Sequence, residues 1–371
     1  MKKSVLAMAV LSTLSFGALA DVTVYGVVDG GFNYSHVKTD GQKADNNFEM
    51  KSGQQSGSRF GIEGSEALSE NVTAGFILEG GFNMDDGELG QNGRVFGREA
   101  NLFVITPAGE FSMGRVGGVG GGNGSYGLLG QLSPFGTSWG DFSANVSNYL
   151  ISAGRMDNTF TYRTPEMAGW QLTAQYSLKA ASVKDDLAFT NGQESTEDAN
   201  RYMAVGLSYM DGPLTLVAVV DSMDYSNLYD FGRDNSVVAT VGGSYDFGCF
   251  KPYLGVQYFD KAVRGLMSGS TNGFERESAL VPMDGWAWTA GADMPAFGGT
   301  AKVGMGYVKA KQTEQRDNEF DRIGASLGYE YNLSKRTNLY AATSYMKTSY
   351  EFGDKVDQKA VEVLTGLRHT F

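Results

Sequence analysis

The sequence predicts an all-β fold, a 16-stranded antiparallel barrel that spans a membrane. Three observations predict it. Apolar and polar residues alternate with period two, short and long connections alternate between these segments, and glycine is abundant (51 residues) while proline is rare (7). Period-two alternation places successive side chains on opposite faces of a strand. After residue 20 the longest apolar runs have about five residues, which is too short for a membrane helix.

The first twenty residues predict a secretory signal peptide. Lys2 and Lys3 precede an apolar stretch, and Ala18-Leu19-Ala20 forms a small-x-small ending before Asp21. A membrane-anchor helix is a weaker alternative, because the apolar core is too short to span. We therefore expect residues 1–20 to be cut away and residues 21–371 to form one barrel domain.

Charge and cysteine content exclude several functions. Without Lys2 and Lys3 the chain has 28 basic side chains (30 − 2) against 42 acidic ones, a net charge of −14 (28 − 42). A nucleic-acid partner is excluded because such binding needs a basic footprint. Cys249 is the only cysteine, so neither a disulfide framework nor a thiolate metal site is expected. No cofactor is predicted.

The strands follow from the alternation, in chain order. The apolar rows are Val72, Ala74, Phe76 and Leu78; then Trp170, Leu172, Ala174, Tyr176 and Leu178; then Val237, Ala239, Val241 and Tyr245; and finally Ile323, Ala325, Leu327, Tyr329 and Tyr331. Each row alternates with mostly polar or glycine residues, so these segments predict strands with one apolar face.

Connections between the strands fall into two classes. The short ones lie at 68–71, 106–110, 164–169, 210–213, 246–250, 294–299 and 332–336. The long polar ones lie at 39–55, 84–94, 117–154, 181–199, 225–234, 261–283, 311–319 and 349–358. Seven short turns and eight long loops join sixteen strands. This is typical of an outer-membrane barrel with short periplasmic turns and long external loops, since a closed sheet leaves no backbone group unpaired in lipid. A soluble, exported β-sandwich or solenoid is weaker, because it explains neither the loop pattern nor the terminal aromatic residue.

Aromatic residues predict two rings at the membrane interfaces. The periplasmic ring is expected from Trp170, Tyr209, Tyr245, Tyr329, Tyr331 and Phe371, and the outer ring from Trp286, Trp288, Tyr307 and Tyr345.

Several stretches resemble the general porins of Gram-negative outer membranes. They are DVTVYGVVDGG (21–31), SGSRFGIEGSEAL (56–68), TAGFILEGGFN (73–83), VFGREANLFV (95–104), FSMGRV (111–116), RMDNTFTYRTPEMAGW (155–170), LSKRTNLYA (333–341) and GLRHTF (366–371). The resemblance implies a homotrimer of 16-stranded barrels without enzymatic activity, set among outer-membrane lipid and lipopolysaccharide. Each barrel is then a water-filled channel for passive diffusion of ions and small hydrophilic solutes, narrowed by an inward-folded third loop. Segment 117–154 is the longest connection and fits that constriction loop, because long structureless loops are usually functional.

Pore residues are predicted partly from strand parity and partly from the resemblance. Parity places Arg59, Glu79 and Asp29 on the lumen side, and the resemblance supports Arg59 and implies an arginine of the pore wall at Arg98. Arg155 and Arg163 are further candidates, and Asp141 is the only carboxylate between Gly117 and Gly154. The predicted pore residues are Arg59, Arg98, Arg155, Arg163, Asp29, Glu79 and Asp141.

The predicted ion selectivity depends on the constriction. Acidic side chains in the outer loops should attract cations, but salt screens them within about 8 Å. Arg59 and Arg98 would favour anions where the pore is narrow, because rings of charged side chains set ion preference, so weak selectivity with its sign set at the constriction is expected. In the alternative interpretation these arginines only pair with Asp29, Glu63 or Glu79 and stiffen the barrel.

Arg115 shares parity with Phe111 and Met113 and is predicted to point outward. An arginine facing lipid is costly, and the resemblance buries this strand in a trimer. We therefore expect Arg115 to pair across subunits with an acid of the 84–94 loop, namely Asp85, Asp86 or Glu88.

The chain ends on VEVLTGLRHTF, whose alternation predicts a last strand with Leu367, His369 and Phe371 on the lipid side. This strand must pair with the first one to close the barrel. The resemblance also implies that Phe371 and the alternation before it are the signal read by the barrel-insertion machinery.

Other function classes have weaker support. GGVGGGNGSYG (117–127) lacks the Gly-Lys-Ser/Thr of a phosphate loop, and NMDDGELGQNG (83–93) lacks the twelve-position calcium pattern. A hydrolase needs a histidine against a serine or acid, yet His36 and His369 are expected a barrel length apart. A substrate-specific channel stays open, because Tyr126, Phe135, Trp139 and Phe142 could form an aromatic track. An adhesin-like barrel is a further alternative.

Overall fold

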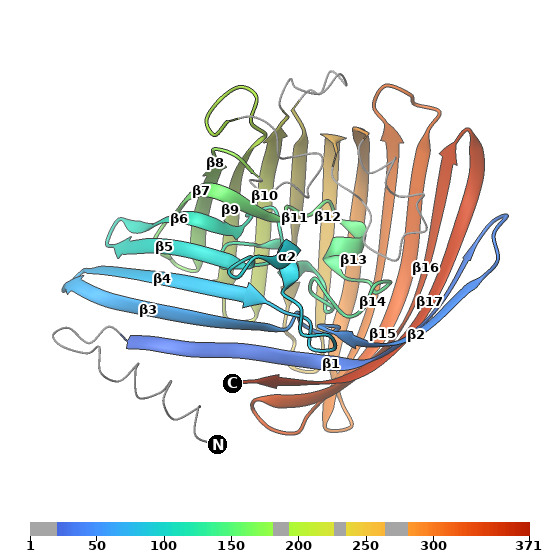
Figure 1. Cartoon of the computed structure of the whole chain (residues 1–371), viewed down its shortest axis with the longest axis horizontal. Helices are drawn as coiled ribbons and strands as arrows, with labels where there is room; N and C mark the ends of the chain where they lie inside the picture. Colours follow the sequence, from blue (N-terminus) through green and yellow to red (C-terminus); the bar gives the residue numbers. More distant parts are fainter. Residues whose placement is uncertain (1–20, 181–192, 226–234, 264–280) are drawn as a thin grey trace.

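The computed structural model describes residues 21–180, 193–225, 235–263 and 281–371 (Figure 1). The predicted signal peptide, residues 1–20, lies outside the described residues. So do parts of the long connections predicted at 181–199, 225–234 and 261–283. Within the described ranges, no helix is long and apolar enough to cross a membrane.

Seventeen strands form one antiparallel sheet. They are β1 (Asp21–Thr39), β2 (Asp45–Ser52), β3 (Arg59–Ser69), β4 (Val72–Gly81), β5 (Glu99–Thr106), β6 (Gly109–Gly117), β7 (Arg155–Arg163), β8 (Trp170–Ser177), β9 (Arg201–Asp211), β10 (Leu214–Asp224), β11 (Val237–Tyr245), β12 (Lys251–Ala262), β13 (Met283–Ala296), β14 (Gly299–Gln312), β15 (Glu319–Asn332), β16 (Thr337–Phe352) and β17 (Asp354–Thr370). The helical pieces are single turns: α2 (Gly90–Gly93), α3 (Val146–Tyr149) and the 3-10 turn η1 (Leu129–Leu132).

The seventeen strands fill sixteen positions in the wall. β2 pairs with residues 30–37 of β1 and β3 with residues 21–27 of the same strand, so β2 and β3 are one wall strand interrupted at 53–58. β17 pairs with β1 from Val27 to Thr39, which closes the sheet into a barrel, and the two strands run side by side in Figure 1. The prediction of a 16-stranded closed barrel is therefore confirmed.

Two of the predicted long loops are wrong. β16 and β17 continue through 349–358 and turn at Gly353, which has a φ of 87°. The polar residues that predicted a loop there are paired strand residues, with Lys347 Nζ 2.7 Å from Asp357 Oδ2 across the hairpin. Similarly, most of 39–55 is a tight hairpin followed by β2.

The connection from β6 to β7 crosses the barrel interior (Figure 1). We call residues 118–154 the inward loop. Its ring of Tyr149 packs on wall glycines: a Cβ added at Gly306 would lie 2.3 Å from the ring, and one at Gly324 would lie 2.0 Å from the hydroxyl. Phe135 covers Gly304 in the same way, at 2.9 Å. The abundant glycine thus lets the loop approach the wall closely.

The lipid-side row predicted at the C-terminus is confirmed. Val361, Val363, Leu367 and Phe371 are exposed on the outer face, whereas Glu362 and Leu364 between them are fully buried by the interior.

Candidate functional site

A polar cavity of ≈ 880 Å³ lies between the inward loop and the wall. Its charged lining residues are Arg59, Glu63, Glu79, Arg98, Glu99, Arg155, Lys251, Asp293 and Lys302. They come from strands β3 to β5 and β7 on one side and from β12 to β14 on the other, together with the segment just before β5. Residues distant in sequence therefore share one water-accessible space.

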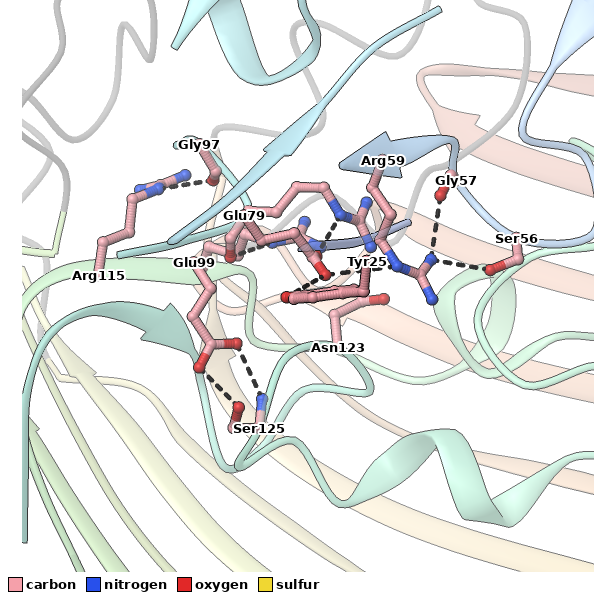
Figure 2. Close-up of polar contacts among 12 residues, drawn as sticks. Tyr25, Ser56, Gly57, Arg59, Glu79, Gly97, Glu99, Arg115, Asn123 and Ser125 are labelled. Atoms are coloured by element: carbon pink, nitrogen blue, oxygen red, sulfur yellow. Dashed lines mark hydrogen bonds and ion pairs between the residues drawn. The ribbon is translucent and has the colours of Figure 1, made fainter. Parts of the chain in front are cut away.

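Glu79 is the centre of the first charged group. Its Oε1 lies 2.6 Å from Nε of Arg98 and its Oε2 lies 3.4 Å from Nε of Arg59. The hydroxyl of Tyr25 donates a hydrogen bond of 3.1 Å to the same Oε2. Figure 2 shows Arg59 and Tyr25 converging on this carboxylate. One carboxylate therefore faces two guanidinium groups, which leaves the group positive.

Arg155 adds a further cation beside this group. Its Nε donates to the backbone carbonyl of Arg98 at 2.9 Å. Among the described residues, no carboxylate forms an ion pair with Arg155.

On the opposite wall, Lys302 and Tyr253 share Asp293. Nζ of Lys302 lies 3.0 Å from Oδ1 of Asp293, and the hydroxyl of Tyr253 donates to Oδ2 at 2.9 Å. Nζ of Lys251 lies 5.3 Å from the centre of the Tyr253 ring, a cation–π distance. Within the part of the chain that the structure describes, Lys251 has no ion pair with an acid.

The inward loop brings no charged side chain into the cavity. Its lining residues are Gly122, Asn123, Gly124, Ser125, Gly130, Gln131, Ser133, Pro134, Phe135, Gly136, Thr137, Ser138 and Trp139. Asp141, which was predicted to line the pore, lies inside the barrel beside Lys51, with which it forms an ion pair, and outside the cavity lining. Its backbone N–H donates to Glu362 on β17 at 3.0 Å.

Glu99 anchors the start of the inward loop. This carboxylate is 4% exposed and accepts hydrogen bonds from Oγ of Ser125 at 2.6 Å and from its backbone N–H at 3.2 Å (Figure 2). Nearby, Arg163 pairs with Glu110 and lies 5.1 Å from the ring centre of Tyr126. Arg163 therefore supports the loop and does not line the cavity, contrary to the prediction.

Tyr126 completes this anchor. Burial, and then its hydrogen bond to Glu110, raises the pKa of the Tyr126 phenol. The phenol therefore remains a hydrogen-bond donor at neutral pH.

The aromatic track that a substrate-specific channel would need is not exposed in the structure. Tyr126, Phe135, Trp139 and Phe142 are at most 4% exposed, because they fill the space between the inward loop and the wall. A passing solute would meet little of their surface.

Asp29 faces the interior as predicted, but it is fully buried and does not line the cavity. Its Oδ2 accepts the backbone N–H groups of Gln55 at 2.9 Å and Ser56 at 2.6 Å. The hydroxyl of Tyr340 donates a hydrogen bond to Oδ1 of the same carboxylate. The carboxylate therefore holds the break between β2 and β3.

The predicted acid partner of Arg115 is wrong. Arg115 forms an ion pair with Asp157 of its own chain, and its Nε donates to the carbonyl of Gly97 at 2.8 Å (Figure 2 shows the latter contact). The cause is a bulge: Gly114 pairs with Thr159 but Val116 pairs with Met156, so β7 has one extra residue here. Arg94 also reaches Asp157, at 2.8 Å.

The terminal residues lie at the closing seam. Backbone hydrogen bonds of 3.1 Å run in both directions between Gly26 and Phe371. Leu367 lies opposite Gly30, and His369 lies opposite Val28.

In the same register His36 lies opposite Val361, so the two histidines are far apart along β1. The described residues hold no cluster of three metal-binding side chains.

Sequence reasoning missed most of the cavity lining, including Tyr25, Glu99, Lys251, Tyr253, Asp293 and Lys302. Lys302 could have been found by parity, since it alternates with Ala301 and Val303. Glu99 could not, because only the course of the inward loop shows what it binds.

Comparison with known proteins gives consistent matches. The family described as Gram-negative porin matches residues 7–350. An outer membrane porin protein of Bordetella pertussis is 32% identical over 396 aligned residues, covering 100% of both chains. The solved anion-selective porin from Comamonas acidovorans has a TM-score of 0.64 at 24% identity, covering 95% of this chain and 100% of that one. OmpT of Vibrio cholerae, solved in a trimer form, has a TM-score of 0.58 at 14% identity, covering 95% and 99%.

Proposed function

The chain belongs to the Gram-negative porin family, and from this premise we propose that its charged cavity gives the channel a preference for small anions. The protein is located in the bacterial outer membrane, where its barrel is a channel for passive diffusion of solutes. Porins are channels and not enzymes. The selectivity of the channel depends on the charged residues of this chain that line the cavity.

The balance of charge in the cavity carries the proposal. Five cationic side chains (Arg59, Arg98, Arg155, Lys251, Lys302) line it against four acidic ones (Glu63, Glu79, Glu99, Asp293). Arg155 and Lys251 form no ion pair with any acid of the described chain, and the inward loop adds no carboxylate. Charged side chains that line a narrow passage set ion preference. The cavity lining therefore carries a net charge of +1 (5 − 4), and an anion meets cations without an acid partner on both walls.

The alternative, that the cations only stiffen the wall, applies to some of them. Glu79 binds Arg59 and Arg98, and Asp293 binds Lys302. Acids of the external loops, such as Asp85 and Asp86, are outside the cavity, and salt screens them within about 8 Å. The Comamonas acidovorans porin is anion-selective, but at 24% identity that likeness bears on the fold alone.

Reversal potentials test the proposal. The refolded protein is placed in a planar bilayer across a potassium chloride gradient, and the wild type is compared with Arg155→Ala and with Arg155→Ala/Lys251→Ala. We expect the anion-to-cation permeability ratio to fall stepwise. Lys335→Ala, which removes the same charge from a short turn outside the cavity, is the matched control. A double variant with the wild-type reversal potential would contradict the proposal.

We also propose that the chain assembles as a homotrimer through the face around β2. Among the described strands β2 pairs only with β1, so its outer edge has no strand partner. Phe32 and Phe48 stack there with ring centres 5.9 Å apart, and Phe48 is 70% exposed. The trimer form of the similar OmpT supports the stoichiometry. Lipid and lipopolysaccharide would surround the remaining outer face.

Cross-linking tests this assembly. Phe48→Ser is expected to reduce the trimer band in cross-linked outer membranes. Phe297→Ser removes a phenylalanine that is 98% exposed at a short turn and is expected to change nothing. Equal trimer yields for both variants would refute the assignment of this face.

A further inference from the structure

The break between β2 and β3 is longer than the sheet requires. β1 pairs Gly30 with Ser52 and Val27 with Arg59, so only Val28 and Asp29 lie between the two paired positions. An unbroken strand would need two residues to pass them, yet the chain has six, 53–58. We call these six residues the inward segment, because four of them, Gly53, Gln55, Ser56 and Gly57, line the cavity.

The inward segment is held from the wall side. The buried carboxylate of Asp29 accepts two of its backbone N–H groups, and the backbone N–H of Gly53 donates to the carbonyl of Asp29 at 2.9 Å. The amide of Gln55 donates to Glu330 at 2.9 Å and accepts from Asn338 at 2.8 Å. These five hydrogen bonds, and two more between Ser58 and the backbone of Asp29, fix the segment of six residues to the barrel wall.

The same segment receives the tip of the inward loop. The backbone carbonyl of Gln54 accepts the N–H groups of Trp139 at 2.5 Å and Gly140 at 3.1 Å. Gln54 is 2% exposed. The inward loop therefore docks on the inward segment and not on the strand ladder at this point.

The inward segment also holds the arginines of the cavity. Nη1 of Arg59 donates to Oγ of Ser56 and to the carbonyl of Gly57, at 3.0 Å each (Figure 2). A Cβ added at Gly57 would lie 3.0 Å from Nη1 of Arg98, which is tighter than an ordinary contact. Glycine at this position thus leaves room for the second guanidinium group.

We propose that the inward segment is a second constriction element, which together with the inward loop sets the width of the passage and the positions of Arg59 and Arg98. Ser56 and Gly57 are then specificity-determining residues. The effect on width stands on the cavity geometry alone, whereas the effect on selectivity rests on the proposed anion preference.

Replacing residues 53–58 by two residues, Thr-Val, tests the proposal, because two residues are what the register of β1 demands. We expect the single-channel conductance to rise roughly twofold and the anion preference to fall, since the passage widens and Arg59 loses two acceptors. Heat-modifiable mobility on gels verifies that the barrel folds. A folded replacement with wild-type conductance would overturn the proposal.

Point variants keep the test decisive if the replacement does not fold. Gly57→Ala should displace Arg98 and change the reversal potential, while Gly90→Ala, where the added Cβ stays 3.5 Å from its nearest neighbour, serves as the matched control. Ser56→Ala should shift the reversal potential and Ser56→Thr, which keeps the hydroxyl, should restore it. If neither Gly57→Ala nor Ser56→Ala differs from wild type in reversal potential, the proposal fails.

The two proposals fail separately. A wild-type reversal potential in Arg155→Ala/Lys251→Ala with a raised conductance in the replacement would refute the anion preference and leave the second constriction element standing. The converse pair of results would refute only the constriction element.

Discussion

The carboxylate of Glu362 on the last strand accepts the backbone N–H of Phe142 in the inward loop at 3.1 Å. It also accepts the N–H of Asp141 at 3.0 Å, and it is fully buried. The loop that narrows the channel is therefore tied to the strand that closes the barrel. Two N–H groups of the loop depend on one side chain, and this dependence can be tested.

Replacing that carboxylate should loosen the loop. In Glu362→Ala two buried N–H groups lose their acceptor, at a cost of about 1–3 kcal/mol each. We expect a lower melting temperature and noisier single-channel current, because the loop tip samples more positions. Glu351→Ala, which removes an exposed acid near the end of β16, should behave as wild type. An unchanged current trace in Glu362→Ala would show that the aromatic packing alone fixes the loop.

The wall glycines under Tyr149 give a second prediction. Gly306→Ala places a methyl group where the ring lies, and overpacking typically costs about 1–3 kcal/mol. We expect the loop to move toward the lumen, so thermal stability and single-channel conductance both fall. The double variant Gly306→Ala/Tyr149→Ala removes the clash and should recover conductance relative to the single variant. If the double variant conducts less than Gly306→Ala, the ring does not transmit the displacement.

Much of this fold follows from strand alternation, and what does not follow has identifiable causes. Parity placed Arg59 and Glu79 in the cavity and Leu367 on the outer face, because a regular strand presents alternate residues to each side. Parity carries no information on what a side chain meets across the lumen. Parity predicts the correct face for Asp29, yet the role of this carboxylate depends on Tyr340, which is distant in sequence.

Irregular strands account for two further errors. The bulge between β6 and β7 supplies Arg115 with Asp157, and a period-two pattern cannot show the extra residue. GQQSGS (53–58) has the composition of an external loop, so the predicted loop at 39–55 takes in the first three residues of the inward segment. Only its pairing register reveals that the chain leaves and re-enters a single wall strand there.

The Arg94–Asp157–Arg115 cluster provides a third prediction. The carboxylate of Asp157 is 8% exposed and meets both guanidinium groups. In Asp157→Asn two partly buried cations lose their counter-charge, and breaking a buried pair costs about 3–5 kcal/mol. Asp357→Asn breaks a solvent-exposed pair with Lys347 and should cost far less. Urea unfolding in detergent or vesicles measures both, and similar losses would mean that the cluster is not buried in the membrane-embedded protein.

The contact between Phe371 and Gly26 separates two roles of the last residue. A Cβ added at Gly26 would lie 2.3 Å from the terminal ring and 2.6 Å from the backbone carbonyl oxygen of Arg59, so Gly26→Ala strains the seam and displaces the ring but keeps Phe371. Deleting Phe371 removes both the ring and its two backbone hydrogen bonds.

If Phe371 acts as a signal for the barrel-insertion machinery, the deletion should lower outer-membrane yield severalfold while Gly26→Ala inserts normally with a lower melting temperature. If it acts only through the seam, both variants should lose yield and stability together. We expect the first outcome, because the ring is 48% exposed on the outer face and so is accessible before closure. Pulse labelling measures the assembly yield of each variant, and the melting temperature of the finished barrel measures its stability. Parallel losses of yield and stability in both variants would refute the signal role.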